Sequence, residues 1–245
     1  MHLVASIAGQ PVQPPDGFGL HAPDGIVPVP IAILMWALTT AVLAVAVRRT
    51  NARLDERAIP LMGVTAAFIF AAQMVNFPII GGTSGHLLGG VLAAVLLGPW
   101  AGTLVMACVV AVQGLLFQDG GLLIMGANIF NMGVVGTLGG YGLYRSLCHV
   151  LGGEDRARIP AAGIAAWVAV MAGAASMSVQ LVASGPPVEI VLPAMLSVHA
   201  LIGIGEALIT MAALAFIAAT RADLFKLRDA GGPIESGSTI VAGNA

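Results

Sequence analysis

The chain has 245 residues, of which 58% are hydrophobic and only 9% are charged, and its mean hydropathy is +0.95. Soluble domains carry roughly 25% charged residues, so this balance excludes an ordinary soluble domain and predicts an all-α polytopic membrane protein. The net charge of -2 and the lack of a basic run give no indication of a nucleic-acid partner.

Long apolar stretches recur along the chain. A helix needs roughly 20 apolar residues to cross the hydrocarbon core, and by this measure the sequence predicts a seven-helix transmembrane bundle. The third span is too short to cross alone, so it is either tilted or begins from the irregular segment before it. In the last span, Pro193 predicts a short preceding segment or a kink. The predicted spans are 30–47, 59–77, 87–97, 100–117, 122–143, 161–183 and 191–219.

The basic residues predict the orientation, because Lys and Arg collect on the cytoplasmic side of a membrane protein. They follow the first, fifth and seventh spans, and the segments on the opposite side contain none. We therefore expect the N-terminus and His86 outside and the C-terminus inside, with residues 221–245 as a partly disordered cytoplasmic tail. The basic residues are Arg48, Arg49, Arg53, Arg57, Arg145, Arg156, Arg158, Arg221, Lys226 and Arg228.

The segment from Asn76 to Gly90 interrupts the apolar pattern with glycines and one histidine, His86. Non-helical backbone at membrane depth is tolerated where protein or water satisfies its polar groups, so such breaks often line a site. The alternative interpretation is a simple surface hairpin between two helices.

Two ionisable residues, His199 and Glu206, fall inside the last span on one helix face, about 10 Å apart at a rise of 1.5 Å per residue. Buried ionisable residues in membranes are candidates for function. The structural interpretation is that Glu206 is protonated or caps backbone and amide groups of neighbouring spans, while His199 forms a local hydrogen bond.

His21 precedes the first span in a Pro-Gly turn and, like His86, is expected at the outer end of the bundle. Two histidines alone are a weak metal site, because borderline metals usually take three or four ligands. Only Asp24 and Asp119 offer nearby carboxylates.

Five sequence blocks in this order resemble the CbiM/NikM family, the substrate-capturing membrane subunit of energy-coupling-factor transporters for cobalt and nickel. The resemblance covers residues 21 to about 220, and implies a seven-helix fold without catalysis by this chain. The domain boundaries are then 1–19 for an extension of doubtful status and 20–220 for the transmembrane domain. The blocks are His21 to Gly25, Asn76 to Gly90, Gln118 to Gly121, Gly126 to Met132 and Pro193 to Glu206.

The resemblance also implies a metal site. In the family the metal is held by a free N-terminal amine, the deprotonated amide of the second residue, its imidazole, and a second imidazole from a Ser-Gly-His loop. These positions fall on Leu20, His21 and His86. Planar nitrogen donation suits Ni(II), yet the same donors bind Co(II), so the donor set does not choose between them.

The sequence departs from the family pattern at its start, because residues 1–19 precede Leu20 and lack the marks of a signal peptide. One hypothesis is that translation starts at Leu20, from a leucine-type codon read as methionine. A second is proteolysis after Gly19. In the third, Met1 and His2 supply the amine and imidazole that join His86.

Further expectations concern the surroundings of the site and the partners. Candidates for orienting the imidazoles are Asp24, Asn76, Thr83, Ser84 and Gln113. The sequence contains no phosphate-binding loop, so the energy for transport must come from another chain. The resemblance implies that the partners are a membrane coupling subunit (the T subunit), cytosolic ATPases and a possible small accessory membrane protein. No permanently bound cofactor is expected, and the transported Co(II) or Ni(II) is the substrate. The alternative is an ion-coupled secondary transporter that uses His199 and Glu206.

Overall fold

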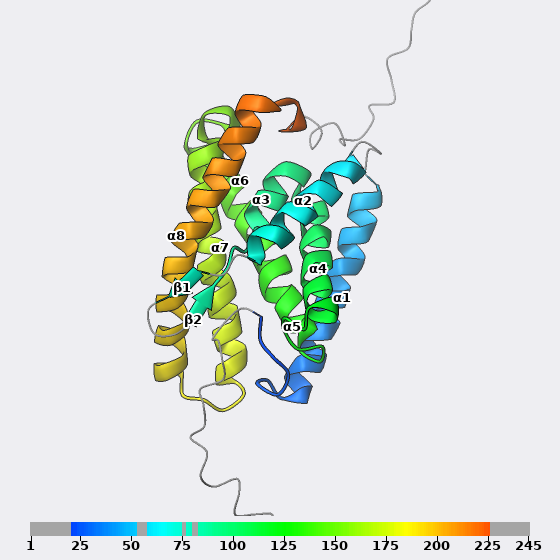
Figure 1. Ribbon diagram of the computed structural model, residues 1–245, viewed down its shortest axis with the longest axis vertical. Helices are drawn as coiled ribbons and strands as arrows, with labels where there is room; N and C mark the ends of the chain where they lie inside the picture. The colour runs from blue at the N-terminus through cyan, green and yellow to red at the C-terminus, as the bar shows by residue number, and fades with distance from the viewer. Residues whose placement is uncertain (1–20, 53–57, 75–76, 80–82, 226–245) are drawn as a thin grey trace, which may run out of the picture.

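The computed structural model describes residues 21–52, 58–74, 77–79 and 83–225, and for 77–79 and 83–85 the backbone alone (Figure 1). Helices pack side by side along the long axis, and a small hairpin lies beside α7 and α8. The elements are α1 Val29–Asn51, α2 Ala58–Gln73, β1 Phe77–Ile79, β2 Thr83–Gly85, α3 Gly90–Leu97, α4 Pro99–Leu116, α5 Met125–Ile129, the π-helix η1 Phe130–Gly139, α6 Gly140–Val150, α7 Glu154–Val182 and α8 Val188–Thr220.

The predicted class of helical membrane protein is confirmed in its main part. Among the described residues, four helices are long and apolar enough to cross a membrane, namely α1, α4, α7 and α8. The shorter α2 is also apolar, with 16 residues. The fold is not purely α-helical, because β1 and β2 form an antiparallel pair in which Phe77 faces Gly85 and Ile79 faces Thr83. The number of crossings and the orientation of the termini stay predictions.

The predicted span 59–77 is wrong at its end. Helix α2 stops at Gln73, and Phe77 already belongs to β1. Pro78 explains part of this, because a proline disfavours helical backbone in the residue before it. Within the described part of Asn76 to Gly90, β1 and β2 form a hairpin that leads directly into His86.

Three other predicted boundaries shift. The span 122–143 begins only at Met125, since the N–H groups before it bond to Asp24, and it continues through η1 and α6 to Val150. Helix α7 begins at Glu154, so the charged residues before the predicted start at 161 are helical rather than in a loop. The prediction of a separate segment before Pro193 is wrong, because α8 runs through this proline. Near the helix start, its missing N–H removes a single backbone hydrogen bond.

The predicted short third span is the eight-residue helix α3, which lies inside the bundle against α4, α7 and η1. All of its residues from Gly90 to Leu96 are buried. Gly90 permits the close contact with η1, because a Cβ there would lie 3.0 Å from the Gly136 carbonyl carbon. The helix that follows His86 is thus held on several sides.

The motif that runs from α5 into η1 connects three parts of the bundle. Gly126 contacts the backbone of Trp36 in α1, where a Cβ would not fit. Asn131 in η1 accepts hydrogen bonds from Ser176 Oγ at 2.7 Å and Gln180 Nε2 at 2.8 Å, both in α7. π-Helical turns often accompany functional sites, and this one begins next to the residues that hold the N-terminal segment.

Candidate metal site

The segment just before α1 is fixed by backbone hydrogen bonds at Ala22. The Ala22 N–H donates to Asn128 Oδ1, and the Asn128 amide donates back to the Ala22 carbonyl, both at 3.1 Å. The same carbonyl accepts the Gly121 N–H at 2.9 Å. Because both polar groups of Ala22 are engaged, the preceding residue, His21, has a defined position.

Asp24, two residues after Ala22, also holds this segment in place. Its carboxylate accepts the Leu122 N–H at 3.0 Å and the Ile124 N–H at 3.1 Å. Asp24 was predicted to orient an imidazole, but its described bonds are to backbone. Its contribution is therefore to dock the segment that carries His21.

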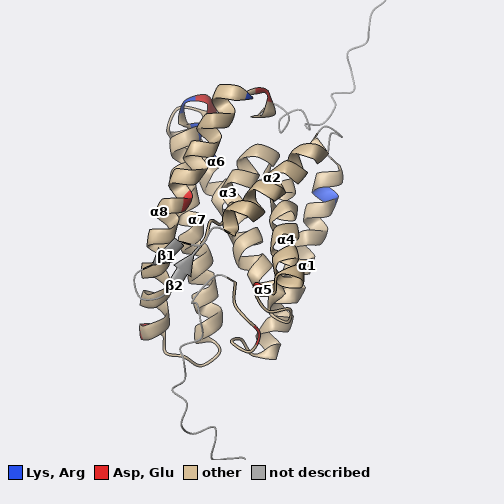
Figure 2. Ribbon diagram, viewed as in Figure 1, with Lys and Arg blue, Asp and Glu red and all other residues tan. Residues whose placement is uncertain are grey.

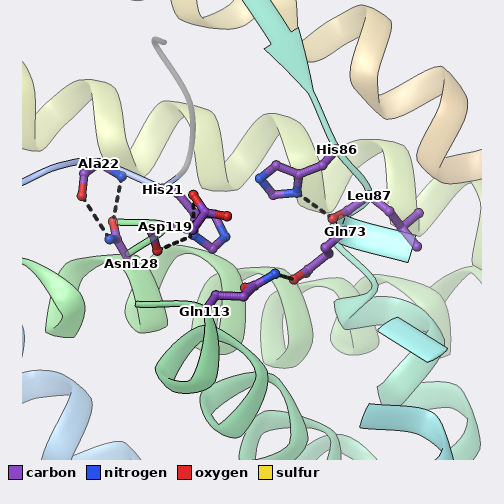
Figure 3. A network of polar contacts seen from close by, with 8 residues as sticks. All are labelled: His21, Ala22, Gln73, His86, Leu87, Gln113, Asp119 and Asn128. Atoms are coloured by element: carbon purple, nitrogen blue, oxygen red, sulfur yellow. Dashed lines mark hydrogen bonds and ion pairs between the residues drawn. The ribbon is translucent and has the colours of Figure 1, made fainter. Parts of the chain in front are cut away.

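The structure brings together the two histidines that the sequence singled out (Figure 3). The ring centroids of His21 and His86 lie 4.9 Å apart in an edge-to-face arrangement with an interplanar angle of 78°. His21 comes from the segment before α1 and His86 from the end of the hairpin. The predicted convergence of these residues at one place in the fold is present.

Hydrogen bonds define which ring nitrogen of each histidine is free. His21 Nδ1 lies 3.2 Å from the Asp119 carbonyl oxygen, and His86 Nδ1 lies 2.8 Å from the Leu87 carbonyl oxygen. A carbonyl only accepts, so in each neutral ring the proton is on Nδ1 and the lone pair is on Nε2. His21 Nε2 is buried without a hydrogen-bond partner. A free imidazole lone pair is suited to a cation, and in His86 it is on Nε2.

The electrostatics favour the neutral form of His21. Burial, and then the nearby His86, lower the pKa of His21 from 6.5 to about 4, against the smaller opposing effect of Asp119. The Asp119 carboxylate oxygen lies 3.6 Å from Nδ1. A neutral imidazole is the form that binds metals, so the fold prepares this ligand at neutral pH.

We expect this pKa to make the metal-free protein less stable in acid. The unfolded chain takes up the His21 proton near pH 6.5 and the folded chain only near pH 4, so the free energy of unfolding should fall by up to roughly 3 kcal/mol as the pH drops through this window. Thermal unfolding in detergent between pH 7 and pH 4.5 would measure it. His21→Ala should show a flatter pH profile, and an equally steep one would contradict the assignment.

Two buried amides connect α4 and α2 to the peptide after His86 (Figure 3). Gln73 at the end of α2 donates to the Leu88 carbonyl at 2.7 Å, and Gln113 in α4 donates to Gln73 Oε1 at 2.8 Å. Gln113 was predicted to orient an imidazole, and its described bond acts on Leu88 through Gln73 instead. Gln73 was not predicted, since a single amide at the end of an apolar helix carries no distinctive signal.

Glu206 binds the backbone that follows His86. Its Oε2 accepts the Leu88 N–H at 2.7 Å, and its Oε1 accepts the Gly89 N–H at 2.9 Å. Gly89 has a φ of +82°, a left-handed conformation that lets consecutive N–H groups face one anion. His199 Nδ1 bonds the Met195 carbonyl of its own helix at 2.7 Å. These contacts agree with the structural interpretation, in which Glu206 caps backbone groups and His199 forms a local hydrogen bond.

Several predicted site positions lie outside the described residues. These are Met1, His2, Leu20 and Asn76, and for Thr83 and Ser84 the structure describes the backbone in β2 but not the side chains. Within the described ranges, no group of three or more His, Cys, Asp or Glu side chains has a geometry that could hold a metal. The histidine pair therefore requires further donors if a metal binds there.

The fold and this site define a multi-pass membrane protein in which two imidazoles lie close together. Residues 21–224 match the family model of CbiM, the cobalt uptake substrate-specific transmembrane region. The chain belongs to this family, and is a plasma-membrane component of cobalt and nickel uptake of the CbiM/NikM type. The family is one of transport components rather than of known enzymes.

Relatives and solved structures agree with this assignment. A putative fused nickel transport protein NikMN of Archaeoglobus fulgidus is 40% identical over 218 residues, which cover 88% of this chain and 71% of that protein. The cobalt transport protein CbiM of Geobacter sulfurreducens is 28% identical, with coverages of 94% and 69%. The crystal structure of a truncated transition metal transporter superposes with a TM-score of 0.74 at 31% identity, with coverages of 81% and 98%.

Proposed function

We propose that this chain captures Co(II) or Ni(II) at the outer face of the membrane for an energy-coupling-factor transporter. The metal is the substrate, and its ligands are His86, the imidazole and amide of His21, and the amine of residue 20. The observation that carries this proposal is the 4.9 Å approach of His21 and His86. The relatives named for nickel and for cobalt support both ions as substrates.

The ligand set has a consequence for the His21 ring. A metal bound to the His21 amide nitrogen can also reach Nδ1 of the same residue, because these two atoms close a small chelate ring. Nδ1 now faces the Asp119 carbonyl at 3.2 Å. Loading would therefore exchange this hydrogen bond for a metal bond and shift the ring proton from Nδ1 to Nε2, which has no hydrogen-bond partner now. Protons on the amine, amide and imidazoles compete with the metal, so affinity falls in acid.

The bundle supports seven crossings with the N-terminus outside. Helices α5, η1 and α6 follow one another without a break and make a fifth span beside the four long helices. The shorter helices α2 and α3 are the remaining two spans, and α3 needs the segment before it to complete its passage. Figure 2 shows the described Arg residues toward one end of the bundle, near the end of α1, in α6, near the start of α7 and just after the end of α8. By the positive-inside rule this end is cytoplasmic.

Energy and partners come from other chains. A membrane coupling subunit, cytosolic ATPases and a small accessory membrane protein complete the transporter. An ion-coupled secondary mechanism through His199 and Glu206 is less well supported, because Glu206 is bonded to two backbone N–H groups and His199 to its own helix. Uptake by this chain without any ATPase partner would favour that alternative.

The test combines metal binding with the identity of the N-terminus. We expect the protein purified from the membrane to bind one Ni(II) or Co(II) per chain by equilibrium dialysis, and its intact mass to correspond to a start at residue 20. Three alanines inserted between residue 20 and His21 should abolish tight binding, because the N-terminal amine then no longer neighbours the His21 amide, and three alanines added after Ala245 should not. Full binding by a chain that begins at Met1 would overturn the amine of residue 20 as a ligand.

A further inference from the structure

We infer that Glu206 is a positioning residue for the metal ligand His86, and that it acts through the peptide groups of Leu87, Leu88 and Gly89. This inference rests on the proposed function, because it concerns the same metal site. It assigns to an intramembrane carboxylate a task that is distinct from proton transfer and from metal ligation.

Two peptide groups connect Glu206 to His86 by hydrogen bonds, and we call this connection the relay. Its first peptide group joins Leu87 to Leu88. At one end, its N–H donates to Glu206 Oε2 at 2.7 Å. At the other end, its carbonyl oxygen accepts from His86 Nδ1 at 2.8 Å. A continuous line of hydrogen bonds therefore runs from the carboxylate through one peptide group to the imidazole.

The second peptide group joins Leu88 to Gly89 and is held at both ends as well. Its N–H donates to Glu206 Oε1 at 2.9 Å, and its carbonyl accepts the Gln73 amide at 2.7 Å. Gln73 comes from α2 and Glu206 from α8, so side chains of two helices form hydrogen bonds with this peptide group. Glu206, Gln73 and Leu88 are all at most 2% exposed, so water does not compete for these bonds.

The relay resembles the carboxylate–histidine–metal arrangement in which a carboxylate fixes the tautomer and orientation of a ligating imidazole. Here a peptide group stands between the carboxylate and the ring. A carboxylate that accepts the Leu88 N–H polarises the peptide and strengthens the Leu87 carbonyl as an acceptor. The His86 proton is thereby held on Nδ1, which leaves the Nε2 lone pair for the metal and raises its basicity.

The carboxyl group of Glu206 lies at the start of α3, where both of its oxygens accept N–H groups. Gly89 is the residue before the first helical residue of α3, and the unpaired N–H groups at a helix start favour a negative charge. In the described part of the chain, no Lys, Arg or His side chain forms an ion pair with Glu206. Its described partners are the two N–H groups of the relay.

The experiment measures Ni(II) affinity of the full chain in detergent. Glu206→Gln keeps the shape, but one of its two terminal atoms becomes a donor that cannot accept an N–H. Loss of an outer partner of a metal ligand typically costs about 10- to 100-fold in affinity, and we expect a loss in this range together with a shift of the Ni(II) absorption bands. Glu189→Gln is the matched control, an exposed glutamate at the start of the same helix, and it should bind like the wild type.

Two further variants separate the relay from a simple effect of charge or fold. Glu206→Asp keeps the charge but withdraws the oxygens, so it should lose affinity like Glu206→Gln; unchanged binding would overturn the relay. In a His86→Ala background, Glu206→Gln should alter the weak residual affinity less than twofold. The same loss in both backgrounds would show that Glu206 does not act through His86.

The outcomes also distinguish this inference from the proposed function. A wild-type protein that binds neither Ni(II) nor Co(II) would overturn the proposed function, whereas equal binding by the wild type and Glu206→Gln would overturn the relay alone. If Glu206→Gln does not give a folded protein, Gln73→Met decides. A several-fold loss of affinity in that variant supports the relay, and unchanged affinity overturns it.

Discussion

Replacement of His86 by alanine is expected to remove high-affinity binding of Ni(II) and Co(II). The variant loses one of two imidazole donors, so the loss should exceed the roughly 100-fold that removal of an outer partner typically costs. Its neighbour His21 keeps its hydrogen bond to Asp119 and its docked segment, so the fold should persist. Isothermal titration of the detergent-purified protein, with size-exclusion chromatography as the check of folding, measures both effects.

The control for this variant is His149→Ala. His149 is an exposed histidine in α6 whose side chain has no described hydrogen bond, so its removal tests the general effect of losing an imidazole. We expect wild-type affinity in that variant. Wild-type affinity in His86→Ala as well would refute the site.

Substitution of Gly121 by alanine is expected to weaken metal binding strongly through the N-terminal segment. The added Cβ would collide with the carboxylate and the backbone nitrogen of Asp24, and neither can yield while the carboxylate is bonded to two N–H groups. The Gly121 N–H also donates to the Ala22 carbonyl. The segment must shift, and it takes His21 with it.

The size of the effect follows from which contacts change. Overpacking typically costs about 1–3 kcal/mol of stability, which a folded bundle tolerates. We expect at least a tenfold loss of Ni(II) affinity, because the amide and imidazole of His21 move together. Gly142→Ala is the control, since a Cβ there meets nothing within 4 Å. Parallel titrations of the two alanine variants that gave equal affinities would contradict the docking role of Gly121.

The sequence predicted the helical class and the histidine pair because both leave local signals. Long apolar runs mark the helices, and a histidine among glycines is conspicuous at 86. The end of α2 was misplaced because apolar residues continue into β1, so hydropathy alone does not separate the helix from the strand. The short strands have too few residues to show a period of two.

The parts of the site that the sequence did not predict are those in which a side chain forms hydrogen bonds with the backbone. Leu88 and Gly89 offer N–H groups that any residues except proline would offer, so their pairing with Glu206 has no sequence signature. The sequence indicated a capping role for Glu206 but not its partner. Gln73 was missed for the same reason, because it bonds the Leu88 carbonyl. Only tertiary contact identifies these residues.

The docking of the segment around Ala22 makes the N-terminus a tethered chelator under the proposed function. Its hydrogen bonds to Asn128 and Gly121 hold the peptide donors beside His86 before any metal arrives. A tether of this kind replaces a bimolecular encounter by an intramolecular one, with effective concentrations in the mM range for short linkers. Metal affinity then depends on how firmly the segment is docked, so variants at Asn128 or Gly121 would tune capture and release without altering a single ligand.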